Sequence, residues 1–185
     1  MNKRLIAIIV LGIIQLGASL SMIFTHERVL DSGTLFKFQC APVDPADLFR
    51  GRYVALRFTQ REVSGSYDWA ERGREAYAPL KIAPDGYVRI SELLAEEPEG
   101  GDYLRVTIRH NYNDTVRYNL PFDRYYMRED LAPEAEKAYR SAARSGDKEA
   151  WVDVRVANGR GVIEELFIDG LPVREYLERS GEVEG

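Results

Sequence analysis

The chain has very few of the residues from which disulfides and metal sites are built. Its 185 residues include one cysteine, Cys40, and two histidines, His26 and His110. One cysteine excludes an intramolecular disulfide, and neither histidine has another histidine within metal-ligand spacing. We therefore expect no metal site. A small buried thiol is the favoured interpretation of Cys40, with an intermolecular disulfide as the alternative.

Motifs for cofactor binding and nucleophilic catalysis are also missing. The sequence contains no glycine-rich phosphate loop and no serine in a recognisable nucleophile motif. We therefore expect no cofactor. With 25 basic against 30 acidic residues, the net charge of -5 lacks the clustered positive field that nucleic-acid binding needs. A nucleic-acid partner is therefore not predicted.

One long hydrophobic run is present, and it lies at the N-terminus. Residues 5–24 contain no charge from Leu5 to Phe24, and Lys3 and Arg4 come directly before them. A helix of this length spans about 30 Å, the thickness of the hydrocarbon core of a bilayer. The basic residues predict that the N-terminus is cytoplasmic and that the remainder lies outside a bacterial inner membrane.

A cleavable signal peptide is the alternative interpretation of this run. Ser19 and Ser21 place small residues where a signal peptidase would recognise them. The run is longer than a typical signal-peptide core, which favours an anchor. We expect an anchor over residues 1–25, a short stalk over 26–33, one extracytoplasmic domain over 34–178 and an acidic tail over 179–185.

The remaining sequence predicts an α+β domain with a mainly antiparallel sheet and one longer helix. Alternating apolar residues predict strands over 34–40 and 52–58. Turn residues predict hairpins at 84–86, 113–114 and 158–159, and the Asn-Gly pair of the last is the strongest such signal. An apolar stripe predicts the longer helix over 131–145. We further expect a surface excursion over 62–74, a short helix over 92–96 and a short last element over 173–177.

The segment Gly51-Arg-Tyr-Val-Ala-Leu-Arg-Phe58, which follows Val43-Asp-Pro-Ala-Asp-Leu-Phe-Arg50, resembles the signature of the GDYXXLXY family of bacterial membrane-anchored proteins. In that family an approach like "vDPrdLfrGDY" leads into the motif. Gly51, Tyr53 and Leu56 match it, whereas Arg52 replaces the aspartate and Phe58 the final tyrosine.

Two later elements extend the resemblance. Arg124-Tyr125-Tyr126 is similar to the family's "RYF" element, and Ile168-Asp169-Gly170 is similar to its "idG" turn. The resemblance implies a short anchored ectodomain and brings no activity with it.

The signature allows two interpretations. As a fold determinant it would bury Val54, Leu56 and Phe58 on one face, with Gly51 at a turn. As a recognition surface it would display its polar and opposite-face residues to a partner. The candidate binding residues are then Asp44, Asp47, Arg50, Gly51, Arg52, Tyr53 and Arg57. An acid/base pair of Asp44 and Asp47 is the less favoured role, against capping of a turn.

A local basic cluster overlaps this segment and comprises Arg50, Arg52, Arg57 and Arg61. It is typical of a solvated edge strand, where positive side chains discourage pairing with other chains. Alternatively, it attracts lipid headgroups or an acidic partner, and a hairpin carrying Arg105, Arg109 and Arg117 would continue the surface.

The sequence therefore favours a non-enzymatic, membrane-tethered accessory or interaction domain. Its partners would be the bilayer, through residues 5–24, and a polytopic membrane protein. The alternative is an envelope hydrolase with a site assembled from residues distant in sequence.

Overall fold

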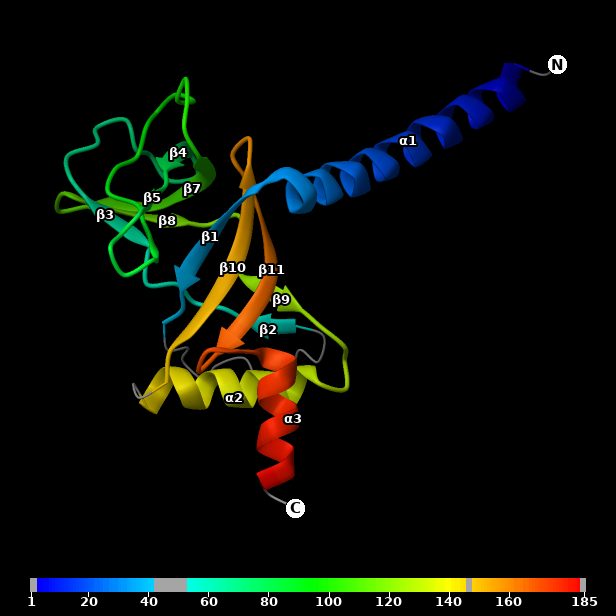
Figure 1. Ribbon diagram of the computed structural model, residues 1–185. Coiled ribbons are helices and arrows are strands. Elements are labelled where there is room, and N and C mark those ends of the chain that lie inside the picture. The colour runs from blue at the N-terminus through cyan, green and yellow to red at the C-terminus, as the bar shows by residue number, and fades with distance from the viewer. Residues whose placement is uncertain (1–2, 42–52, 146–147, 184–185) are drawn as a thin grey trace.

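A computed structural model describes residues 3–41, 53–145 and 148–183 of the chain (Figure 1). The elements are α1 (Lys3–Ser32), β1 (Thr34–Gln39), β2 (Tyr53–Ala55), β3 (Glu62–Ser64), β4 (Glu75–Pro79), β5 (Lys81–Ile82), β6 (Val88–Arg89), β7 (Tyr103–Tyr112), β8 (Thr115–Asn119), β9 (Arg124–Tyr126), α2 (Ala132–Ser145), β10 (Ala150–Ala157), β11 (Arg160–Ile168), β12 (Leu171–Pro172) and α3 (Val173–Val183). The fold is α+β with antiparallel strand pairing, as the sequence predicts.

Two four-stranded sheets form the body of the domain. The first has the order β1-β10-β11-β12 and the second β3-β8-β7-β4. Two smaller pairs, β2-β9 and β5-β6, complete the set of described ladders. A bridge between Leu104 and Gly159 joins β7 to the turn between β10 and β11, so that the two larger sheets meet there.

The predicted hairpin turns are confirmed. Asn113 and Asp114 both have positive φ, and so do Asn158 and Gly159. This conformation matches the right-handed twist of the flanking strands, which is why Asn, Asp and Gly are favoured there. Lys81 pairs with Arg89 across the third turn, at 84–86.

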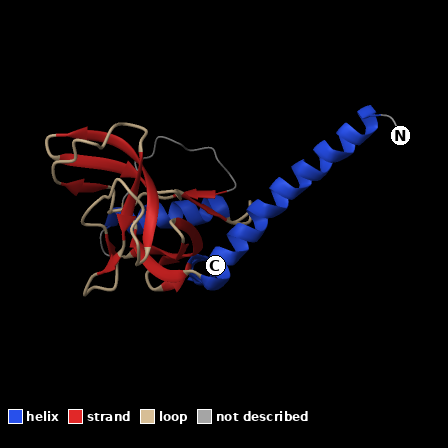
Figure 2. Ribbon diagram, turned by 90° about the horizontal axis from the view of Figure 1, so that it is seen from above, coloured by secondary structure: helices blue, strands red, loops and turns tan. Residues whose placement is uncertain are grey.

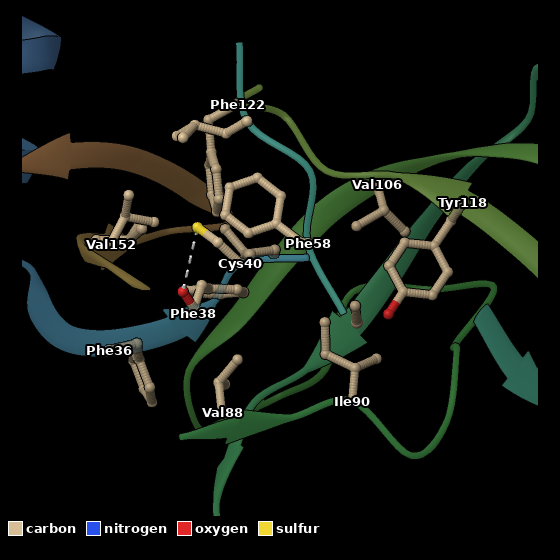
Figure 3. Packing of buried hydrophobic residues seen from close by; sticks show 14 of the residues in the cluster. Phe36, Phe38, Cys40, Phe58, Val88, Ile90, Val106, Tyr118, Phe122 and Val152 are labelled. Atoms are coloured by element: carbon tan, nitrogen blue, oxygen red, sulfur yellow. Dashed lines mark hydrogen bonds between the residues drawn. The ribbon is translucent and has the colours of Figure 1, made fainter. Parts of the chain in front are cut away.

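One hydrophobic core extends across both sheets. At its centre Phe38, Phe58 and Phe122 meet edge to face, with ring centroids 5.2 to 6.0 Å apart. Figure 3 shows these rings around Cys40, with Val106 and Tyr118 of the second sheet on the other side. Cys40 is buried, as predicted, and burial raises the pKa of its thiol to about 12.

Helix α1 leaves this body as a long rod (Figures 1 and 2). Its last turns contact the domain, where Val29 is 5% exposed and lines a groove together with Arg105 and Asn158. The predicted stalk is therefore the helical end of α1. Among the side chains that the structure describes, no helix is long and apolar enough to cross a membrane.

The sequence misses three features. Residues 92–96 are not helical, because Leu94 instead exchanges two backbone hydrogen bonds with Tyr77, at 2.8 and 2.9 Å. The segment 62–74 is not wholly a surface excursion, since β3 pairs with β8 and buries Val63. The element at 173–177 is the start of helix α3, which packs Tyr176 and Leu177 against the core.

Candidate functional site

The signature segment contributes to the core on one face and to the surface on the other. Val54, Leu56 and Phe58 are buried, as the predicted alternation requires. Regular pairing is shorter than predicted: β2 ends at Ala55, and Phe58 forms an isolated bridge with Cys40. The described part of the signature therefore contributes one apolar face to the core, and Arg57 remains exposed beside it.

Strand β2 pairs with β9, so the two segments that carry the family resemblance lie side by side. Tyr53 stands opposite Tyr126 with ring centroids 5.6 Å apart, and the Arg124 guanidinium lies 4.9 Å from the Tyr53 ring. Tyr126 is exposed. The other candidate binding residues, Asp44, Asp47, Arg50, Gly51 and Arg52, lie outside the described residues.

A larger candidate site lies on the second sheet. Two adjoining pockets of about 570 and 750 Å³ share Arg57, Arg61, Arg72 and Arg109 among their lining residues. Arg117 and His110 line the smaller pocket as well. We call this surface the arginine basin, defined by Arg57, Arg61, Arg72, Arg109 and Arg117.

The sequence predicts part of this basin. It groups Arg57 with Arg61 and suggests that Arg109 and Arg117 continue the surface, and all four line the same pocket. Arg105, predicted to join them, instead pairs with Glu97 at 3.4 Å and lines a groove beside α1. Arg72 was missed, because no sequence pattern indicates where its loop lies.

The backbone around Arg57, Arg61 and Arg72 is held by hydrogen bonds. Tyr139 accepts from Arg57 N–H at 3.3 Å and donates to the Ala41 carbonyl at 2.8 Å. The loop that carries Arg72 is fastened to β7, where Gly73 N–H donates to the Ile108 carbonyl and Ile108 N–H to the Arg74 carbonyl. The Arg61 carbonyl accepts a hydrogen bond from Tyr118 N–H at 3.0 Å, which holds the backbone of Arg61 in place.

A β-bulge places Arg109 in the basin. Ile108 pairs with Tyr118 and His110 pairs with Arg117, which leaves Arg109 as an extra residue in β7. A bulge of this kind re-aims a side chain and is common at functional sites. Consistent with this, Ile108 is buried whereas Arg109 and His110 are both exposed.

The basin carries more positive than negative charge. Its lining carboxylates are Glu62, which pairs with Arg117 at 2.9 Å, and Asp123, which pairs with Arg124 at 3.5 Å. Within the described part of the chain, no carboxylate forms an ion pair with Arg57, Arg61, Arg72 or Arg109. Partial burial lowers the pKa of Arg61, and the nearby Arg57, Arg109 and Arg117 lower it further.

Comparison with known sequences identifies the family. The sequence model of the GDYXXLXY protein family matches residues 15–166, and the chain belongs to this family. The match includes the signature, the basin arginines and much of α1. No curated protein and no solved structure matches the chain significantly.

Proposed function

We propose that the chain is a membrane-tethered extracytoplasmic interaction domain. The observation that supports this most is the exposure of α1. Its described large apolar side chains from Ile9 to Phe24 are between 48% and 67% exposed, whereas Val29, near the end of the helix, is buried. An apolar surface of this extent is unfavourable in water and marks a membrane or protein contact.

The sequence of α1 supports the bilayer as that contact. Residues 5–24 contain no charge and would span about 30 Å as a helix. Lys3 and Arg4 favour a cytoplasmic N-terminus at a bacterial inner membrane, which leaves the domain outside the cytoplasm. A polytopic membrane protein is the partner class that we propose for the tethered domain.

An interaction role suits the folded domain better than hydrolysis. Among the described residues, no serine or cysteine forms a hydrogen bond with a histidine, lysine or carboxylate side chain. The thiol of Cys40 is buried and its pKa is raised, so it is a poor nucleophile. The hydrolase alternative therefore has no observation of its own to support it.

The first test concerns topology. Alkaline phosphatase fused to the C-terminus should be active in cells, because the enzyme folds only outside the cytoplasm. The same fusion lacking residues 1–24 should be inactive. A silent phosphatase together with a bright C-terminal cytoplasmic fluorescent reporter would show the opposite orientation and contradict the proposal.

A further inference from the structure

Four of the five basin arginines have no carboxylate partner among the described residues, whereas the fifth, Arg117, pairs with Glu62 at 2.9 Å. Elsewhere, Arg89, Arg105, Arg124, Arg128, Arg140, Arg155 and Arg179 each form an ion pair with an acidic side chain. In the basin, Arg57, Arg61, Arg72 and Arg109 line shared pockets, and among the described residues none of them forms an ion pair with a carboxylate. Like charges held together destabilise the folded state unless an anion offsets them.

Protection of a sheet edge does not explain the position of Arg117. In the order β3-β8-β7-β4, β8 is paired on both sides at Arg117, whereas β7 pairs with β4 only from Tyr103 to Thr107, so Arg109 lies beyond that ladder. Arg109 lies on β7 and Arg117 on β8. Arg57 and Arg72, from other parts of the chain, line the same pocket as these two residues.

We propose that the arginine basin binds a compact polyanion bearing two or more phosphate groups. Guanidinium groups form paired, charge-assisted hydrogen bonds with phosphate oxygens, and arginine is preferred where such groups are recognised. Pockets of about 570 and 750 Å³ lie within the size range of small-molecule sites. Phosphate groups carry the charge density that several guanidinium groups in so small a space require.

The backbone of the site is fixed by contacts within the domain. Three features hold it before any ligand binds: the bulge at Arg109, the hydrogen bonds between the Arg72 loop and β7, and the Tyr139 hydrogen bond to Arg57. A site arranged in advance loses less entropy on binding than a flexible one. The overall charge of -5 means that nonspecific attraction to anions is weak away from the basin.

Two kinds of ligand supply closely spaced phosphate groups: a soluble polyphosphate, and a lipid headgroup with two phosphates. The inference goes beyond the proposed function, and only the lipid source depends on the membrane tether. Ligand binding to the basin is measured by calorimetry, whereas membrane topology is measured with a fusion reporter. A negative result in one experiment therefore leaves the other proposal standing.

The test is a calorimetric titration of the full chain in neutral detergent with tripolyphosphate. We expect binding that weakens as salt is added, because salt screens the charges. In Arg61→Gln/Arg109→Gln the affinity should fall by about tenfold to a hundredfold, from the loss of two charge-assisted contacts. The matched control Arg128→Gln/Arg179→Gln removes two exposed arginines elsewhere and should bind like the parent.

Thermal unfolding separates loss of the site from loss of the fold. The Arg61→Gln/Arg109→Gln variant should melt at or above the temperature of the parent, since it removes like charges. Absence of tripolyphosphate binding at low salt would overturn the proposal. So would a control variant that loses as much affinity as the basin variant.

A second experiment distinguishes a soluble ligand from a lipid headgroup. The full chain is placed in phosphatidylcholine nanodiscs containing either cardiolipin, with two phosphates per lipid, or phosphatidylglycerol at equal lipid charge. Weaker tripolyphosphate binding in the cardiolipin discs alone would assign the site to a lipid headgroup. Equal affinity in both discs would assign it to a soluble ligand.

Discussion

Residues of the signature have separate roles according to the face on which they lie. Leu56 is 8% exposed and belongs to the core, and its N–H donates to the Asp123 carbonyl at 2.8 Å. Its neighbour Arg57 is exposed and lines the basin. Phe58, where the family signature has tyrosine, packs against Phe38 and Phe122 in an apolar cluster. One short segment thus joins the core to the candidate site.

Truncation of Leu56 tests this division. Leu56→Ala should lower the free energy of unfolding by about 2–5 kcal/mol, because it removes buried methyl groups and leaves a cavity. Arg57→Gln, at the adjacent exposed position, should change it by less than about 0.5 kcal/mol. Urea unfolding followed by tryptophan fluorescence, in neutral detergent, measures both. A Leu56→Ala variant that unfolds at the urea concentration of the parent would show that the signature is not part of the core.

At the scale of elements, the turn between β10 and β11 connects the two larger sheets. Gly159 has a φ of 76°, and its carbonyl accepts from Arg105 N–H of β7 at 2.8 Å. A Cβ at this position would lie 2.7 Å from the Tyr103 ring and 2.8 Å from Arg105 Cγ. The turn therefore requires glycine both for its conformation and for close packing against β7.

Two glycine substitutions separate these requirements. Gly86→Ala, at a φ of 83° with no atom within 4 Å of the new Cβ, should cost about 1–2 kcal/mol from the left-handed conformation alone. Gly159→Ala should cost more, because the steric clash with β7 adds to the same strain. The same urea unfolding measurement compares them. Equal losses of stability would mean that β7 moves aside freely and that the contact does not join the sheets.

At the scale of the whole molecule, α1 and the domain form one continuous unit. The helix runs without a break to Ser32, and Val29 near its end is buried against the domain. On the proposed insertion of α1 into a membrane, this connection would hold the domain close to the membrane. Cleavage of the chain after Ser21 would leave Val29 in place but remove most of the exposed apolar surface of α1.

Retention of α1 distinguishes an anchor from a signal peptide. The mature protein should begin at Met1 or Asn2 and stay with the membrane fraction after extraction with alkaline carbonate, because a spanning helix is not removed by such treatment. Mass spectrometry of the purified protein reads its N-terminus. A mature chain beginning at Met22 and recovered in the soluble fraction would identify the segment as a cleaved signal.

Local patterns in the sequence determined those features of the fold that depend on residues adjacent in the chain. The alternation of Val54, Leu56 and Phe58 predicted which face is buried, because successive side chains of an extended chain point in opposite directions. Asn158-Gly159 predicted its turn, because few residues tolerate positive φ. The family, too, was recognisable from the signature and the segment Arg124–Tyr126, which the structure shows to be paired strands.

Tertiary structure alone decided how distant segments combine. Ser91 and the residues after it have the composition of a short helix, yet pairing of Leu94 with Tyr77 gives these backbone groups better hydrogen-bond partners. Arg72 enters the basin because its loop is clamped to β7, and Arg109 enters because of a bulge whose position depends on strand register. Register and loop placement are set by contacts between residues far apart in the chain, which local periodicity does not encode.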